Sequence, residues 1–477
     1  MKRVLVGPFN RVEGDLEVSL DVDAGQVVAA RVNSPLFRGF EQLLVGRVAH
    51  DALAIVPRIC GICSIAQSAA AAAALASASG VQMPTNGKLA QSLILATENL
   101  ADHLTHFYLF FMPDFARSSY VDRSWYPDVA SRFAAIKGSA APAALGARAG
   151  FFKLIGFLAG RWPHSLALQP GGSTKGMTAA ERIRVLALLR EFRGFLETTL
   201  LGDSLEQFSA LASESALRDW AAGRAGDFPA FLNAAYDLRL ESVGRAKDLF
   251  LSYGAYDLFA GGAWSPEYGE TAAVDRLDPA KIAEDVSHAW LAQGEPLPPA
   301  LGETVVDANK AAAYTWCKAP RYAGQVAETG ALARQVVAGQ PLARDLVCRH
   351  GASVTARVVA RMIELATVVP AMEHWVKAIV PGEPFCNQLV LPDSGEGVGL
   401  VEAARGSLGH WLSFRRGRID RYQIIAPTTW NFSPRDGSGQ PGPLEQALIG
   451  LPAGEEAAPT IQHVVRSFDP CMVCTVH

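Results

Sequence analysis

The feature that most constrains this chain is a pair of short cysteine motifs at its two ends. Cys60 and Cys63 form a C-x-x-C near the N-terminus, and Cys471 and Cys474 form another close to the C-terminus. This spacing lets two thiolates bind one metal centre or form a redox pair. Two such pairs so far apart predict a fold that closes its ends around one four-thiolate site.

Length and composition favour a large globular protein. The chain has 477 residues, of which 49% are hydrophobic, and a net charge of −4. It can therefore bury a large core, and its charge gives no reason to expect binding to nucleic acid or to an anionic membrane. The sequence contains no long apolar run that predicts a membrane span and no secretory signal at its start. We expect a cytoplasmic protein, with export on a partner's signal as the alternative.

The three remaining cysteines do not extend the two motifs. Seven cysteines are too few for a disulfide scaffold in a chain of this length. Cys317, Cys348 and Cys386 are isolated, and we interpret them as small buried hydrophobic residues. None belongs to a four-cysteine run of the kind that holds an iron–sulfur cluster.

Hydrophobic periodicity predicts long helices with small antiparallel sheets. Residues 4–32 alternate between apolar and polar side chains, which predicts a hairpin. An Ala-rich stretch, Ser64–Ala78, predicts a helix that ends at Gly80. The first cysteine pair then lies at a helix N-terminus, where partial positive charge favours thiolate over thiol.

Other segments extend the same pattern. Helical spacing predicts helices over 41–56, 88–112, 179–200 and 344–380, the last bent or broken at Gly351 and Pro370. Residues 113–142 are rich in Pro, Gly and Ser and predict a loop, while 411–425 predict a second hairpin. Because both chain ends must reach one site, we expect a single domain of residues 1–477. Its predicted fold class is mainly α with small β-sheets (α+β).

Motifs around and between the cysteine pairs resemble those of one known family. The pairs lie within R-x-C-G-x-C and D-P-C-x-x-C-x-x-H. Before the first pair come R-V-E-G at 11–14 and R-G-F-E at 38–41. Between the two pairs, in order, come D-H-L-T-H-F-Y at 102–108, Y-T-W-C-K-A-P-R-Y at 314–322, A-R-G at 404–406 and P-T-T-W-N at 427–431. The chain resembles the large subunit of a [NiFe] hydrogenase over essentially its whole length. The resemblance implies a bundle of long helices around a buried metal site.

The resemblance also assigns the metal ligands and the reaction, the heterolytic cleavage of H2. Cys60 and Cys471 would be terminal ligands of nickel. Cys63 and Cys474 would bridge nickel to an iron that carries CO and two cyanide ligands. Four soft thiolates suit such metals better than hard cations. The residue types alone would favour a structural zinc site, which is the alternative interpretation of the cysteines.

Further residues match the machinery that the family places around its metals. Glu13 matches a glutamate that carries protons away from the centre. Arg405 matches an arginine held above the metals, and Asp102 and Asp469 match two carboxylates beside it. A buried arginine would keep both carboxylates ionised. Thr428 matches a hydroxyl residue that donates to a cyanide.

The resemblance implies a second metal and a partner. Glu41, the carbonyl of Ile424 and the imidazole of His477 match a Mg²⁺ site, for which oxygen ligands are suitable. Because the chain has no iron–sulfur ligand set of its own, electrons from H2 require a small subunit with iron–sulfur clusters. We expect a heterodimer, or a dimer of heterodimers.

Four departures from the commonest family pattern indicate a subgroup. Gln67 stands where most catalytic members have His, while Ile62 and Phe110 are bulkier than the usual Val and Leu at the inner end of the gas channel. The sequence also stops at His477, where most relatives are made with a tail that is removed after this residue; it is either the processed form or a protein made without a tail. Together these features predict a regulatory hydrogen sensor with low turnover that signals through a histidine kinase. The alternative is an uptake hydrogenase that feeds a respiratory chain.

Overall fold

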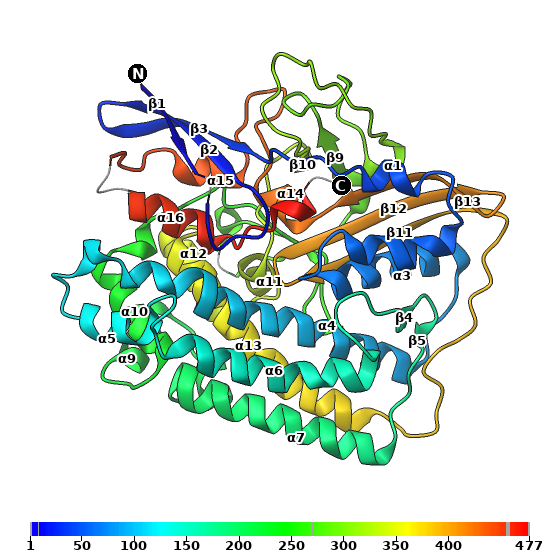
Figure 1. Cartoon of the computed structure of the whole chain (residues 1–477), viewed down its shortest axis with the longest axis horizontal. Helices are drawn as coiled ribbons and strands as arrows, with labels where there is room; N and C mark the ends of the chain where they lie inside the picture. The colour runs from blue at the N-terminus through cyan, green and yellow to red at the C-terminus, as the bar shows by residue number, and fades with distance from the viewer. Residues whose placement is uncertain (1, 8, 270, 455–457, 476–477) are drawn as a thin grey trace.

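A layer of long helices forms one side of the molecule (Figure 1). The computed structural model describes residues 2–7, 9–269, 271–454 and 458–475. Helix α4 (Thr85–Thr105) packs against α6 (Ala140–Ala159), and α6 packs against α7 (Ala179–Phe195). Helix α13 (Val354–Ala378) packs against both α4 and α7. These helices carry much of one large hydrophobic core, which also includes residues from both ends of the chain.

Shorter helices surround this layer. They are α1 (Phe40–Leu44), α2 (Ala52–Ile55), α5 (Tyr126–Phe133), α8 (Leu205–Ser209), α9 (Glu214–Ala221), α10 (Asp227–Asp237), α11 (Ala331–Val337), α12 (Pro341–His350), α14 (Pro427–Asn431), α15 (Pro443–Leu448) and α16 (Ala458–Ser467).

A three-stranded antiparallel sheet covers helix α3 (Ser64–Ser79). Its strands are β11 (Ser394–Ala403), β12 (Gly406–Arg415) and β13 (Arg418–Ile425). The strand β11 approaches the Ala-rich helix very closely, since a Cβ added at Gly399 would lie 2.0 Å from the carbonyl oxygen of Ala70. Small residues on both elements therefore bring the sheet down onto the helix that follows the first cysteine pair (Figure 1).

The N-terminal strands form a separate antiparallel sheet. Strands β1 (Lys2–Val6), β2 (Glu17–Asp23) and β3 (Gln26–Asn33) pair in sequence order. Three smaller sheets complete the described strands: β4 (Leu168–Gln169) with β5 (Gly172–Ser173); β6 (Phe250–Ser252) with β7 (Gly262–Trp264) and β8 (Asp275–Arg276); and β9 (Ile282–Asp285) with β10 (Ala319–Tyr322).

The predicted fold class, mainly α with small β-sheets, is confirmed. Both predicted hairpins form, and the Ala-rich helix ends at Gly80 as expected. The single domain predicted for residues 1–477 stays a prediction, which the shared core supports.

Several local predictions are wrong. The segment 344–380 breaks at Gly351 as predicted, but α13 is not broken at Pro370, because its packing against α4 and α7 outweighs one missing hydrogen bond. A bend at Pro370 stays a prediction. The predicted loop 113–142 contains α5, and the helix predicted over 41–56 divides into the short α1 and α2. Cys317 is buried, but Cys348 and Cys386 are exposed, contrary to their interpretation as core residues.

Helix α6 qualifies the expectation that the chain contains no membrane span. Among the described residues it is the one helix that is long and apolar enough to cross a bilayer, by length and composition only. Its inner face packs on α4 and α7, while its outer face includes Lys153 and several Gly and Ala residues.

Candidate metal centre

The structure brings the two cysteine pairs together. The four sulfur atoms of Cys60, Cys63, Cys471 and Cys474 all lie within 4.8 Å of one another. The distances between Sγ atoms are 3.4 Å for Cys60–Cys471, 3.2 Å for Cys63–Cys474 and 3.1 Å for Cys471–Cys474. Cys63 is half-buried and the other three are buried. This arrangement can hold a compact metal centre, and no pair forms a disulfide.

Backbone pairing holds the C-terminal cysteines beside the N-terminal segment. Residues Glu13 and Cys471 form a parallel bridge, and the N–H of Met472 donates to the carbonyl of Glu13 at 2.7 Å. Gly14 has a φ of +80°, and a Cβ there would lie 2.9 Å from the side chain of Val473. The glycine that follows Glu13 therefore permits a contact between chain segments that no other residue would allow.

The buried thiols share negative charge unequally. Hydrogen bonds from Cys471, Cys474 and Cys63 hold the pKa of Cys60 well below its ordinary value. Hydrogen bonds within the same cluster, with burial, raise the pKa values of Cys63 and Cys474. A cluster that already stabilises one thiolate is prepared for a cation, which would favour ionisation of the others.

A buried arginine joins the two predicted carboxylates. Arg405 donates through Nη1 to Asp102 Oδ2 at 2.6 Å and through Nη2 to Asp469 Oδ1 at 3.0 Å. Its Nε also donates to the carbonyl of Asp469 at 2.9 Å. All three side chains are at most 5% exposed. Because Asp469 immediately precedes the second cysteine motif, this clamp fixes the guanidinium next to the thiols.

The expectation that Arg405 keeps both carboxylates ionised stays a prediction, and burial affects the two groups differently. Burial raises the pKa of Asp102 to about 7, and the nearby Arg405 offsets this effect only in part. Burial alone would also raise the pKa of Asp469, but Arg405 and other neighbouring groups outweigh it and lower the value. The same guanidinium therefore offsets burial at Asp469 more completely than at Asp102.

Glu13 lies at the boundary between the centre and solvent. Its side chain is half-buried, and burial together with the charge of Cys60 raises its pKa despite Arg405 and Arg38. A carboxylate whose proton affinity is increased beside a thiolate cluster suits proton transfer.

The remaining predicted residues lie close to the cysteine motifs. The hydroxyl of Thr428 accepts from the N–H of Cys471 at 3.2 Å, which leaves its own proton to donate elsewhere. Gln67 lies one helical turn beyond Cys63, whose carbonyl accepts from its N–H at 3.0 Å. The Gln67 Nε2 is buried with no protein partner among the described residues. Ile62 and Phe110 are half-buried, and their role in gas access stays a prediction.

The predicted magnesium ligand Glu41 lies in a second buried polar site. Its carboxylate accepts from the N–H of Ile424 at 2.9 Å and from the hydroxyl of Thr304, and both of its oxygens accept from Nζ of Lys318 at 3.1 Å. The ammonium also donates to Gln423 Oε1 at 2.6 Å and reaches Glu284 at 3.4 Å. The third predicted ligand, His477, lies outside the described residues.

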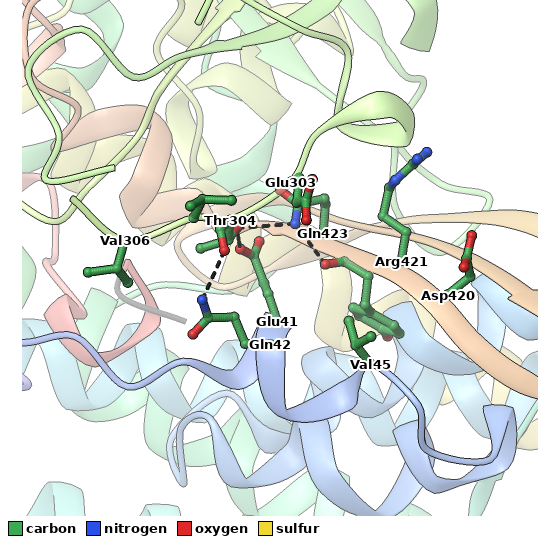
Figure 2. A pocket seen from close by; sticks show the side chains of 11 residues that line it. Glu41, Gln42, Val45, Glu303, Thr304, Val306, Asp420, Arg421 and Gln423 are labelled. Atoms are coloured by element: carbon green, nitrogen blue, oxygen red, sulfur yellow. Dashed lines mark hydrogen bonds between the residues drawn. The ribbon is translucent and has the colours of Figure 1, made fainter. Parts of the chain in front are cut away.

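A pocket with a volume of about 560 Å³ leads from the surface to this second site. Figure 2 shows Asp420 and Arg421 apart from Glu41 and Thr304, which are joined by a hydrogen bond. The pocket is lined by Glu41, Gln42, Val45, Glu303, Thr304, Val305, Val306, Asp420, Arg421, Tyr422 and Gln423. The pocket therefore lies beside Glu41, whose own side chain is only 1% exposed.

Sequence reasoning missed the partners of the predicted residues. Lys318 lies in the Y-T-W-C-K-A-P-R-Y motif, so the motif itself was a signal, but its contact with Glu41 depends on the folded chain. His410 and Tyr422 extend from Gln67 in a hydrogen-bonded chain, and no periodicity marks them. Register between β12 and β13 brings them together.

Comparison with known proteins identifies the class. The family described as nickel-dependent hydrogenase matches residues 38–125 and 142–477. The chain belongs to this family.

Its relatives include uptake and periplasmic enzymes. It is 30% identical to the periplasmic [NiFeSe] hydrogenase large subunit of Desulfomicrobium baculatum, over 100% of this chain and 95% of the relative. It is 24% identical to the uptake hydrogenase large subunit of Rubrivivax gelatinosus, over the same shares. The structure of the reduced Ni–Fe–Se hydrogenase from D. vulgaris Hildenborough is similar, with a TM-score of 0.84, 30% identity and full coverage of both chains.

The residues of this chain fit a nickel–iron centre. Four soft sulfur donors converge, no selenium-containing residue stands among them, and a buried amide and hydroxyl beside them have donor protons to offer. The four cysteines alone would also suit zinc, but membership of the nickel-dependent family decides for nickel.

Proposed function

We propose that this chain is the H2-cleaving large subunit of an uptake-type [NiFe] hydrogenase. The observation that carries the proposal is the convergence of four thiols with the Arg405 clamp and Glu13. The relatives of this chain that are named for a role in hydrogen uptake support the physiological assignment.

The cysteines would hold nickel and iron, with Cys60 and Cys471 on nickel and Cys63 and Cys474 between the metals. The bound metals, with CO and two cyanides on iron, would supply the Lewis acidity and redox capacity for heterolytic cleavage of H2. Arg405 would present its guanidinium to the reacting gas, because Asp102 and Asp469 hold it in one orientation. Thr428 would donate its hydroxyl proton to a cyanide.

Glu13 would accept the proton that leaves the centre. Its raised pKa makes it a better base than an ordinary carboxylate, and its half-buried position lets it pass the proton outward. Proton release needs a half-buried carboxylate such as Glu13, because a fully buried one could not pass the proton to solvent.

The electrons released from H2 need an acceptor outside this chain. The chain has seven cysteines, of which four form the metal centre and three are isolated in the sequence. An iron–sulfur small subunit is therefore the proposed partner. The isolated chain should not reduce an acceptor with H2, and adding the small subunit should restore this activity. Full activity of the isolated chain would exclude the requirement.

The second site would hold Mg²⁺ through Glu41 and the carbonyl of Ile424, with His477 as the further ligand. Oxygen donors and an open pocket support this assignment. The nearby Lys318 lowers the charge that the cation has to balance.

A hydrogen-sensing role is the second candidate, and Gln67 favours it. A neutral amide cannot take up a proton as the usual histidine can. A sensor would turn over slowly in the cytoplasm and act on a histidine kinase, whereas an uptake enzyme would turn over fast and deliver electrons to a respiratory chain. Turnover with an artificial acceptor, together with cell fractionation and identification of co-purifying proteins, separates the two roles.

An infrared spectrum of the purified heterodimer tests the metal assignment. Iron-bound CO and cyanide absorb where protein does not, so bands from both are expected. Their absence, with zinc in the metal analysis, would overturn the proposal.

A further inference from the structure

A chain of three buried side chains leads away from the metal centre. The ring nitrogen Nε2 of His410 lies 2.9 Å from Gln67 Oε1, and Nδ1 lies 2.8 Å from the hydroxyl of Tyr422. The exposed fractions are 0% for Gln67 and His410 and 1% for Tyr422. This hydrogen-bonded series runs from helix α3 to strand β12, which packs on the helix, and then to the neighbouring strand β13.

The donor and acceptor groups give these hydrogen bonds one direction, from Tyr422 through His410 to Gln67. The Oε1 of Gln67 can only accept, so His410 must donate through Nε2–H. The Nδ1 of a neutral imidazole then accepts, and the Tyr422 hydroxyl donates to it. Burial raises the pKa of Tyr422, so the hydroxyl keeps its proton. Each donor fixes the next group, and the series ends at the amide of Gln67.

The free end of the series is the Nε2 of Gln67. It is buried, and none of the described residues accepts its hydrogen bonds. Gln67 follows Cys63 by one helical turn, so the two side chains lie on the same face of the chain. A rotated amide would direct its oxygen, rather than its N–H groups, toward electron-rich thiolates, which is unfavourable.

We propose that His410 and Tyr422 are positioning residues, which hold the Gln67 amide with its N–H groups toward the thiolate cluster. The inference rests on the nickel–iron assignment, because the thiolates are its target. Hydrogen bonds to metal-bound sulfur withdraw electron density and raise the reduction potential of the centre. Tyr422 therefore acts on the metals through two other side chains without touching them.

Loss of the Tyr422 hydroxyl has a specific consequence. In Tyr422→Phe, Nδ1 of His410 loses the Tyr422 donor, which weakens the preference for a proton on Nε2. With the proton on Nδ1, Nε2 repels the Gln67 oxygen. The amide rotates in part of the molecules and turns its oxygen to the thiolates. The heterodimer should show a second set of CO and cyanide bands at lower wavenumber, because iron gains electron density.

The test uses infrared spectra and metal analysis of the loaded heterodimer. Gln67→Leu should move the CO band to lower wavenumber, and His410→Leu should do the same, while His410→Gln should lie nearer the parent because it keeps a donor and an acceptor. Hydrogen oxidation should fall about tenfold in the shifted variants, as for other residues that orient metal ligands. Nickel and iron contents should stay at the parent level.

Two controls isolate the positioning role. Tyr120 also shares a hydrogen bond with a buried histidine, His463, at a distance of 2.9 Å, and this pair does not include Gln67. Tyr120→Phe should leave the bands unchanged. In a Gln67→Leu background, Tyr422→Phe should cause no further shift, because its effect passes through the amide.

The outcomes are distinguishable. Parent-like bands in both Tyr422→Phe and His410→Leu would overturn the inference, as would a further shift in the double variant. If the parent heterodimer has no CO and cyanide bands, the proposed function fails instead.

Discussion

The two buried polar sites, the metal centre and the Glu41 site, balance their buried charges in different ways. In the metal centre, four thiols converge, and the guanidinium of Arg405 is engaged by two carboxylates. In the Glu41 site, the Lys318 ammonium already lies between two carboxylates. The difference indicates which site depends more on metal: Cys63 and Cys474, whose pKa values are raised, need a cation to become thiolates, whereas the carboxylates have one within the protein.

The largest effect is expected from removing one thiol. Cys471→Ser should abolish both metal binding and hydrogen oxidation, because a hard hydroxyl is a poor substitute for a soft ligand shared within a compact cluster. Nickel and iron analysis with an activity assay measures this. A matched control is Cys317→Ser, which changes a buried cysteine outside the cluster. Full activity of Cys471→Ser would contradict the assignment.

Glu13→Gln comes next and tests the proton route of the first site. The amide keeps the shape of the side chain but cannot take up a proton, so H/D exchange should fall roughly 10²–10⁴-fold. Metal contents and infrared bands should persist. Since Glu17 lies on the adjoining strand β2, Glu17→Gln serves as the control. Unchanged exchange in Glu13→Gln would show that protons leave by another path.

Lys318→Met examines the second site. Its loss leaves Glu41 and Glu284 buried beside each other without their cation, which should cost about 3–5 kcal/mol of unfolding free energy. Thermal unfolding measures this, and added Mg²⁺ should recover part of the loss if the site accepts the ion. Lys310→Met should cost less, because Lys310 donates to backbone carbonyls. If both variants lost the same unfolding free energy, Lys318 would not be the internal cation that distinguishes the Glu41 site from the metal centre.

The limits of sequence reasoning also differ between regions. The Ala-rich helix α3 and both hairpins were predictable because local patterns determine them. The path of α13 through Pro370 was not, since tertiary packing overrides the local rule.

In the candidate site, too, local motifs were predictive and contacts made by tertiary folding were not. Motifs identified the cysteines, Arg405 and its two carboxylates, which the structure places together. The lysine beside Glu41 and the chain from Gln67 to Tyr422 remained hidden, because strand register and contacts between distant segments create them. The raised pKa of Asp102 was also unpredictable, because burial cannot be judged from a motif.

The smallest effect is expected from widening the proposed gas path. Ile62→Val with Phe110→Leu removes little volume, so folding and metal content should stay close to the parent, with a stability loss of roughly 1–2 kcal/mol for such truncations. Tight packing makes a narrow path sensitive to single methyl groups, so the double variant should admit oxygen and lose activity during turnover in air. Ile155→Val with Phe192→Leu makes the same changes at buried positions on α6 and α7. Activity followed over time under oxygen distinguishes the two double variants. If both match the parent, bulk at Ile62 and Phe110 does not protect the centre, and the hydrogen-sensing role loses its support from these positions.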